Sequence, residues 1–408
     1  MAGTETVARP ALIRGLAELT APVDPAEFLS GYWGRRPLHV QARDAERFRG
    51  LMTLDDMDRI LAVSSLRESD LHVVTAGRRH RFEDEDEDVG TEAVYALYRQ
   101  GATVAVNFLH RRWEPLALLC AQLSRELSAL PQTNAYLTPA GAQGFAPHYD
   151  THDVFVAQIH GVKRWRLYET SKTLPEPAEP WAAPDGWAEE PVAEFELRPG
   201  DLLYLPRGTP HSAATQDSSS LHLTIGVTPI TWASVVRDAV NRVIGEHAEY
   251  REALPPGFAD SAHGRADRVA HARELVARLT GLVDPEASMT ELGRSTAAAG
   301  AGPASGRLRD LEAVRAIDLD TPVRRRDGMR PWGLVGDGAG SILLRTGETS
   351  LRLPERLGPD LEFAAAGAGF TGRALPGPLD GRGRVVLVRR LVEEGFLTVI
   401  RTTNEDEG

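Results

Sequence analysis

The stretch that decides the fold is residues 147–168, which read PHYDTHDVFVAQIHGVKRWRLY. Residues 154–159 are apolar and rich in β-branched side chains, which is typical of a strand. A turn is indicated at residues 160–163. Residues 164–168 then alternate basic with apolar or aromatic side chains, as a return strand would. We therefore expect a meander of short antiparallel strands here.

A candidate metal site begins inside this stretch, where His148 and Asp150 are two residues apart. On a strand, residues i and i+2 point to the same face, so both side chains can reach one ion. His211 follows a turn signal at 199–201 and a short apolar run at 202–205. Two histidines and one carboxylate leave metal positions open for a co-substrate and dioxygen, as in non-haem Fe(II) enzymes. We therefore predict that His148, Asp150 and His211 are the metal ligands and the catalytic centre.

Short apolar strands separated by Gly/Pro turns continue beyond these ligands, and a last strand is expected at residues 221–227. This pattern favours a sandwich or barrel, a class that includes the jelly roll of cupins. His152, His160 and His222 lie near the ligands and are candidates for supporting them or contacting substrate. A histidine without such placement is more often a hydrogen-bonded core residue. Structural roles are therefore expected for His39, His72, His80, His110, His247, His263 and His271.

These motifs together resemble the JmjC-type ribosomal oxygenases. The similar segments are residues 32–38, 143–168, 200–211 and 221–225. Such a long, ordered set is far more specific than a His-x-Asp pair alone. The resemblance implies a double-stranded β-helix of the cupin class and an Fe(II)- and 2-oxoglutarate-dependent protein hydroxylase, in which the three predicted ligands hold the iron.

The resemblance also implies residues that bind the co-substrate. Lys163 matches the basic residue that pairs with the distal carboxylate of 2-oxoglutarate, a buried anion that needs a cation and hydrogen-bond donors. Asn134 matches a polar residue near the co-substrate. Relatives often carry a small hydroxyl where this chain has Gly226, and Thr224 is the nearest substitute. Taken without the family, the sequence favours a solvated turn lysine at Lys163, and a turn asparagine is the alternative at Asn134.

At 408 residues the chain is long enough for two or three domains. Helices that brace the barrel are expected at residues 24–29, 53–61 and 113–130, because each segment has a capping or helical apolar pattern. Residues 170–192 are rich in Pro, Ala, Glu and Trp, and form either a lip over the site or a plain surface loop. The catalytic domain is predicted to span residues 1–230.

The composition changes after Pro229. Helical periodicity covers residues 232–282, and the Ala/Gly/Ser-rich residues 293–306 are typical of a linker. The resemblance implies a helical dimerisation segment at 231–300 and a winged-helix-like domain at 301–408, so the whole chain is predicted to be mixed α+β. In the last domain, strands are expected at 341–345, 350–353 and 395–400, and a helix at 384–394.

The net charge of −12 argues against a sequence-independent nucleic-acid partner, although Arg324, Arg325 and Arg326 form a small basic cluster. An acidic chain suits a basic protein or peptide partner, such as a ribosomal protein. The acidic run 83–88 either steers that partner or is a solvated loop. No run is long enough for a membrane helix, the first fifteen residues lack a signal-peptide core, and Cys120 is the only cysteine. These features favour the cytoplasm.

Three functions remain open on the sequence. The first is hydroxylation of an arginine or histidine side chain in a ribosomal protein, with Fe(II) and 2-oxoglutarate, by a homodimeric enzyme. The second keeps the iron chemistry but acts as an N-methyl demethylase or hydroxylates a biosynthetic peptide. The third is a non-catalytic cupin-like binding protein, which the complete set of ligands together with Lys163 disfavours.

Overall fold

The computed structural model describes residues 13–400, apart from 83–87, 171, 184–186, 188–189, 259–263, 301, 303–304, 330–331, 337–339, 347–348 and 367. Nearly all of the acidic run at 83–88 therefore lies outside the described residues. The chain forms two compact units. One contains residues 1–229 and 299–408, and the other contains residues 230–298.

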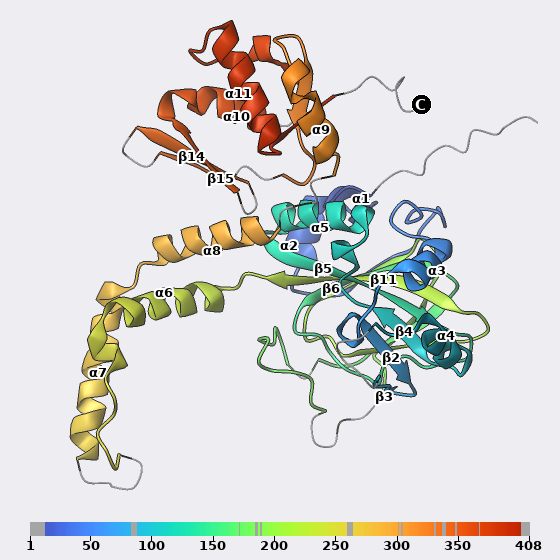
Figure 1. Ribbon diagram of the computed structural model, residues 1–408. Coiled ribbons are helices and arrows are strands. Elements are labelled where there is room, and N and C mark those ends of the chain that lie inside the picture. Colours follow the sequence, from blue (N-terminus) through green and yellow to red (C-terminus); the bar gives the residue numbers. More distant parts are fainter. Residues whose placement is uncertain are drawn as a thin grey trace, which may run out of the picture. The chain divides into compact units, whose positions relative to one another are not determined.

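Two antiparallel sheets form the core of residues 13–229 (Figure 1). The larger has eight strands in the order β1-β9-β6-β11-β5-β4-β2-β3, and the smaller has the order β10-β7-β8. This arrangement is the double-stranded β-helix that the sequence predicts. The strands of the large sheet are β1 (Leu38–Val40), β2 (Leu71–Thr75), β3 (Arg78–Arg79), β4 (Thr103–Val106), β5 (Ala129–Thr138), β6 (Asp153–His160), β9 (Leu202–Leu205) and β11 (Ser220–Pro229). Those of the small sheet are β7 (Lys163–Leu167), β8 (Ala193–Leu197) and β10 (His211–Thr215).

The strands around residue 161 correct one expectation. β6 and β7 are both present, but they are not a paired meander: β6 lies between β9 and β11, whereas β7 lies between β10 and β8 in the other sheet. Gly161 makes the crossing possible because its φ is +65°, and a Cβ there would lie 1.8 Å from the carbonyl oxygen of Ser219. The sequence indicated the strands, while their partners are set by the fold.

Strand β6 is buried on both faces, which explains its continuous apolar sequence. Val154 and Val156 pack between the two sheets with residues of β7, β8 and β9. Phe155 and Ala157 point the other way, into the core that the N-terminal helices cover. There Phe28 lies 5.5 Å from Phe155, measured between ring centroids. The sheet is thus held rigidly from both sides.

Five helices brace the large sheet, and α5 packs against β5 (Figure 1). The predicted start at Asp24 is confirmed, because its carboxylate accepts a hydrogen bond from the Ala26 amide at 2.8 Å. The helix expected at 113–130 ends earlier: Ser128 adopts a left-handed φ of 48°, and β5 begins at the next residue. The helices are α1 (Leu16–Thr20), α2 (Pro25–Gly31), α3 (Leu54–Val63), α4 (Thr91–Arg99) and α5 (Glu114–Leu127).

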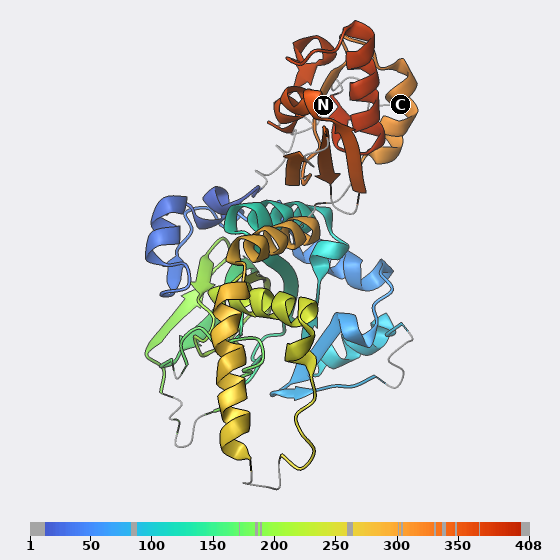
Figure 2. The ribbon, with the colours of Figure 1, turned by 90° about the vertical axis from the view of Figure 1, so that its left-hand side faces the viewer.

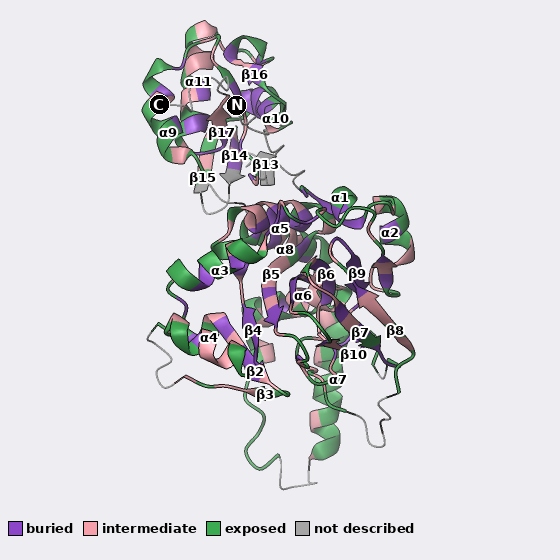
Figure 3. Ribbon diagram, turned by 90° about the vertical axis from the view of Figure 1, so that its right-hand side faces the viewer, coloured by how far each residue is buried: buried purple, intermediate pink, exposed green. Residues whose placement is uncertain are grey.

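The second unit is helical, as its periodicity predicts. It consists of α6 (Trp232–Glu246), α7 (Arg265–Leu282) and most of α8 (Pro285–Ala299), and α7 is the longest of these (Figure 2). The linker expected from residue 293 is wrong up to residue 299, because alanine favours a helix more than any other residue and α8 continues through this stretch. No residue of α7 is buried, whereas the strands of the barrel are largely buried (Figure 3).

The C-terminal part of the chain has its own apolar core. The expected strands and the helix are present with shifted ends. Asp310 and Arg326 form an ion pair in which both side chains are 4% exposed. Within the described residues, no helix is long and apolar enough to cross a membrane. The elements are α9 (Arg307–Ala313), β12 (Pro322–Arg325), β13 (Trp332–Gly336), β14 (Ser341–Thr346), β15 (Thr349–Pro354), α10 (Gly358–Ala365), β16 (Phe370–Thr371), α11 (Gly381–Glu393) and β17 (Leu397–Val399).

Candidate metal centre

The three predicted ligands meet at one point of the barrel. His211 begins β10, as expected from the sequence. His148 and Asp150 do not lie on a regular strand; instead His148 forms a single antiparallel bridge with His211, with amide-to-carbonyl distances of 3.1 and 2.8 Å. The candidate ligand atoms of all three side chains lie within 4.8 Å of one another. The bridge, and not a strand face, therefore brings them together.

Backbone carbonyls fix the orientation of both imidazoles. The Nδ1–H of His148 donates to the carbonyl of Ala146 at 2.8 Å, and the Nδ1–H of His211 donates to the carbonyl of Thr209 at 3.0 Å. Because a carbonyl oxygen can only accept, Nδ1 carries the proton in each ring. Each Nε2 is then left with a lone pair for a metal, an arrangement typical of metal-binding histidines.

The electrostatics of the site agree with this arrangement. Burial lowers the pKa of His211 to about 4, and His148 nearby acts in the same direction, while Asp150 opposes both. His211 is therefore neutral near pH 7, which is the form that binds a metal. The Nε2 of His211 lies 3.7 Å from Oδ2 of Asp150. This donor set of two imidazoles and one carboxylate fits a divalent transition metal such as Fe(II).

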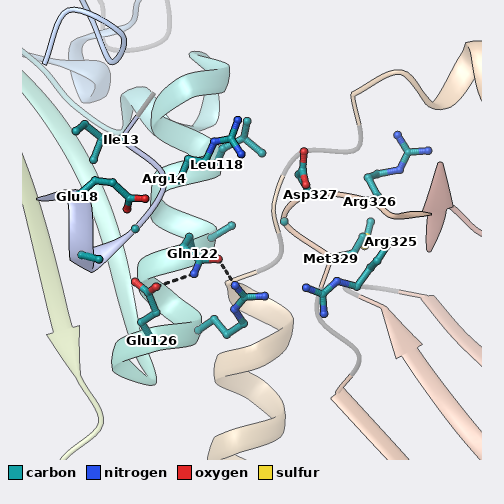
Figure 4. A pocket seen from close by; sticks show the side chains of 15 residues that line it. Ile13, Arg14, Glu18, Leu118, Gln122, Glu126, Arg325, Arg326, Asp327 and Met329 are labelled. Atoms are coloured by element: carbon teal, nitrogen blue, oxygen red, sulfur yellow. Dashed lines mark hydrogen bonds between the residues drawn. The ribbon is translucent and has the colours of Figure 1, made fainter. Parts of the chain in front are cut away.

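The ligands open into a cavity of about 290 Å³. A second cavity, drawn in Figure 4, has charged and amide side chains such as Gln122 and Glu126, but none of its lining residues is a histidine. The cavity at the ligands is therefore the candidate active site. Its lining residues are His72, Asn107, Asn134, Tyr136, Gly144, Phe145, His148, Asp150, His152, Val154, Val156, Lys163, Trp165, His211, Ser212, Ala213, His222, Thr224 and Gly226.

Lys163 is inside this cavity and is only 2% exposed, so it is not a solvated turn lysine. Its Nζ donates to Oγ1 of Thr138 at 2.9 Å. In the part of the chain that the structure describes, no carboxylate forms an ion pair with Lys163. Burial lowers its pKa to about 7. A buried cation with free donor capacity is a suitable partner for a ligand carboxylate.

The two other predicted co-substrate residues also line the cavity. Asn134 and Thr224 face each other across β5 and β11. The Oδ1 of Asn134 already accepts a hydrogen bond from the amide of Phe108 at 3.0 Å, so its amide NH₂ is the group left for a ligand. The hydroxyl of Thr224 is the nearest substitute for the one that Gly226 lacks. Both residues therefore lie in the wall of the same cavity as Lys163.

Sequence reasoning did not single out Trp165, and it expected only a structural role for His72, which also lines the cavity. Trp165 Nε1 and His222 Nδ1 are buried polar atoms with no hydrogen-bond partner among the residues that the structure describes. The ring of His222 stacks on Tyr136 at 5.0 Å, with an angle of 4° between the planes. Alternation along β7 and β11 places both residues on the same faces as Lys163 and Thr224, which was the available signal.

Three polar or aromatic residues close to the ligand motif, Tyr136, Gln143 and Tyr149, differ in their relation to the cavity. Tyr136 lines the cavity, whereas Gln143 and Tyr149 do not. The hydroxyl of Tyr149 donates to the carbonyl of Glu179 at 3.1 Å, and its ring packs 5.1 Å from that of Trp181. Tyr149 is therefore covered by the insertion at 170–192, which extends beside the ligand segment.

Comparison with known proteins agrees with this geometry. Residues 108–235 match the family model of the JmjC domain. The chain is 32% identical over 250 residues to the bifunctional lysine-specific demethylase and histidyl-hydroxylase NO66 of Drosophila persimilis, covering 60% of this chain and 36% of that protein. It is 33% identical over 259 residues to human ribosomal oxygenase 1, covering 59% and 39%. The chain thus spans well under two thirds of these curated relatives.

The fold resembles that of Escherichia coli YcfD. A structure of this ribosomal oxygenase in complex with cobalt and succinic acid aligns with a TM-score of 0.51 at 17% identity, covering 93% of this chain and 99% of that one. A complex of YcfD with cobalt and 2-oxoglutarate aligns with a TM-score of 0.50 at 16% identity, with the same coverage. At this identity the likeness is evidence for the fold alone.

Proposed function

We propose that this chain, which contains a JmjC domain, is an Fe(II)- and 2-oxoglutarate-dependent oxygenase that hydroxylates a protein side chain. The observation that carries the proposal is the ligand set of His148, Asp150 and His211, with both imidazoles already turned toward one point by backbone carbonyls. When bound, iron, 2-oxoglutarate and dioxygen supply the oxidising chemistry that inserts one oxygen atom into a C–H bond, with succinate and carbon dioxide as co-products.

The protein's own contribution is to bind and orient these groups. His148, Asp150 and His211 would hold the metal, and Lys163 would pair with the distal carboxylate of 2-oxoglutarate. The unpaired Trp165 Nε1 and His222 Nδ1 supply further polar atoms near this end of the cavity. Buried polar atoms without partners are costly, so a ligand that pairs with them is favoured. The cavity fits a small dicarboxylate for this reason.

The proposed target is an arginine or histidine side chain of a ribosomal protein. Relatives named ribosomal oxygenase and histidyl-hydroxylase support this class. A net charge of −12 favours a basic partner and speeds its association. The cytoplasm, where ribosomes meet 2-oxoglutarate, is the proposed location.

Mass spectrometry of ribosomal proteins tests this proposal. Ribosomes from source cells that lack the protein would be incubated with purified enzyme, iron and 2-oxoglutarate. We expect one peptide to gain a single oxygen atom, and the gain to require all three components. The His211→Ala variant provides the inactive control. Oxidation that persists without 2-oxoglutarate would contradict the proposal.

A second candidate is oxidation of an N-methyl group, which the name of the Drosophila relative supports. Hydroxylation of an N-methyl carbon gives an unstable hemiaminal that releases formaldehyde. Stable hydroxylation releases none. Formaldehyde measured alongside succinate therefore separates the two reactions: equal amounts of both products indicate demethylation, whereas succinate without formaldehyde, matched by oxygen gained in the protein, indicates hydroxylation.

The helical unit is proposed to mediate homodimerisation. Trp232, Val236 and Val276 are 77%, 62% and 64% exposed, and Met289 is 53% exposed. Large apolar side chains with this exposure on one small unit are typical of an association surface. We expect a dimer in analytical ultracentrifugation, and a monomer when Trp232 and Val236 are both changed to serine. The C-terminal residues 301–408 are proposed to form a winged-helix-like module that contacts protein and not DNA.

A further inference from the structure

His152 lies directly on Gly226. A Cβ on Gly226 would lie 2.9 Å from Cε1 of His152, and 3.2 Å from each of its ring nitrogens. Contacts this short to all three atoms mean that the imidazole occupies the space of a side chain at position 226. Only glycine at position 226 therefore leaves room for the imidazole of His152 in its present position.

The backbone next to His152 is firmly held. Oδ1 of Asp153 accepts a hydrogen bond from the Tyr204 hydroxyl at 2.7 Å, and Oδ2 lies 3.4 Å from Nη1 of Arg207. The Tyr204 hydroxyl in turn accepts from the amide of Gly34 at 2.7 Å. This network fixes the start of β6, so the ring of His152 is presented from a rigid element.

One ring nitrogen of His152 is nevertheless without a partner. The residue lines the cavity, and its Nδ1 is buried with no hydrogen bond to any residue that the structure describes. The described residues of the cavity wall include one carboxylate, Asp150, which belongs to the metal site. A group bound beside His152 would therefore be held by hydrogen bonds and not by an ion pair.

His152 lies away from Lys163, the residue proposed to bind the co-substrate. His222, Thr224 and Gly226 line the cavity at alternate positions of β11, so the first and last are about 13 Å apart at the rise of a strand. Lys163 lies near the first, because Trp165, two residues further along β7, has its ring centroid 5.6 Å from that of His222. His152 covers the last. The ring of Trp165 lies 5.7 Å from that of the ligand His211 and 5.6 Å from that of His222, measured between centroids.

We infer that His152, seated on Gly226, forms part of the pocket for the target side chain and hydrogen-bonds to it through Nδ1. The inference rests on the proposed function: 2-oxoglutarate extends from the metal toward Lys163, so the target must approach from the other side. His152 is then a specificity-determining residue. The competing role is a hydrogen bond to the co-substrate, in place of the hydroxyl that position 226 lacks.

The first arm of the test needs no target. Affinity for 2-oxoglutarate would be measured by calorimetry on the Mn(II)-loaded full-length protein, for the wild type, His152→Phe and Lys163→Ala. Phenylalanine keeps a ring on Gly226 but removes the nitrogen. We expect the dissociation constant of His152→Phe to remain within twofold of the wild type, while that of Lys163→Ala rises at least tenfold. An equal rise for His152→Phe would assign it to the co-substrate and overturn the inference.

The second arm measures the initial rate of oxygen incorporation into ribosomal protein at a limiting concentration of ribosomes. We expect about a tenfold fall for His152→Phe, a similar fall for Gly226→Ala, which displaces the ring, and partial recovery in His152→Asn, which restores a hydrogen-bonding atom. His160→Phe is the matched control, because His160 is exposed at the far end of β6, the strand that His152 precedes. Unchanged rates for His152→Phe would overturn the inference. If the wild type consumes 2-oxoglutarate without oxidising ribosomal protein, the ribosomal target fails, and the first arm still decides whether His152 serves the co-substrate.

Discussion

The two ends of the cavity are built in opposite ways. At the metal end, the ligands lie on an irregular segment and the first residue of β10, yet both imidazoles are held by hydrogen bonds to backbone carbonyls. At the other end, Lys163 lies on a regular strand, but its charge has no carboxylate partner among the described residues. The imidazoles of the metal end thus have hydrogen-bond partners within the protein, whereas Lys163 has no carboxylate partner in the described part of the chain.

Because of this difference, we expect the two ends to respond differently to the substitution of a single residue. A metal site depends on the full number of ligands, so loss of one removes the function as a whole. The lysine end is completed by the co-substrate itself, so loss of one donor weakens binding in a graded way. The predictions below test this contrast.

The largest effect is expected at the metal end. His211→Ala should abolish turnover, exceeding the roughly 100-fold loss that is typical when only a supporting residue of a metal site is removed. Metal content by mass spectrometry and 2-oxoglutarate consumption measure this. The control is His271→Ala, an exposed histidine of α7. A variant that retains Fe(II) and turnover would remove His211 from the ligand set.

A smaller effect is expected at the other end. Lys163→Ala should weaken 2-oxoglutarate about 10- to 100-fold, because a charge-assisted pair contributes about 1.5–3 kcal/mol. Metal affinity should change little. The sequence offers a matched control in Lys172→Ala, its only other lysine, which is exposed and paired with Glu179 at 2.5 Å. Equal losses of metal and co-substrate affinity in Lys163→Ala would contradict the proposed separation between the metal end and the lysine end.

At the metal end, the sequence identified the three ligand residues but not the backbone geometry that brings them together. His148, Asp150 and His211 were identified from spacing, but the argument placed the first two on a strand, and the structure uses a single backbone bridge. Spacing along the chain indicates which residues can lie close together. A backbone bridge joins segments that are distant in sequence, so spacing does not predict it. The same limit explains β6 and β7, whose strand character is local while their partners are set by the crossing at Gly161.

At the lysine end, the sequence pattern alone did not identify the functional residue. The position of Lys163 followed from resemblance alone, because a lysine next to a predicted turn is ordinarily solvated. Its burial depends on how the small sheet packs against the large one. The contact between His152 and Gly226 could not be predicted either, because His152 precedes β6 and Gly226 lies on the distant strand β11. The need for glycine at position 226 is apparent only from this contact. Helix caps such as Asp24 were predictable because they are local.

The pH dependence of co-substrate binding sharpens the contrast further. Burial lowers the pKa of Lys163 to about 7 in the free protein. Below that pH the lysine is charged and ready to bind a dianion; above it, binding must also take up a proton. The dissociation constant of 2-oxoglutarate should therefore rise up to about tenfold per pH unit above 7. Calorimetry of the Mn(II)-loaded protein from pH 6 to pH 9 measures this, and Lys163→Arg should flatten the profile because arginine stays charged.

The smallest effect is expected between the two ends. Thr224 lies opposite Asn134 on the cavity wall, and a neutral hydroxyl hydrogen bond contributes about 1 kcal/mol, so Thr224→Val should weaken 2-oxoglutarate by about fivefold or less. Valine keeps the shape and the strand preference of threonine, which separates hydrogen bonding from packing. A fivefold change would mean that Thr224 replaces the hydroxyl missing at Gly226. With no change in Thr224→Val and an intact Lys163 effect, co-substrate recognition would be concentrated at the lysine end alone, and the middle of the cavity would serve only to separate it from the metal.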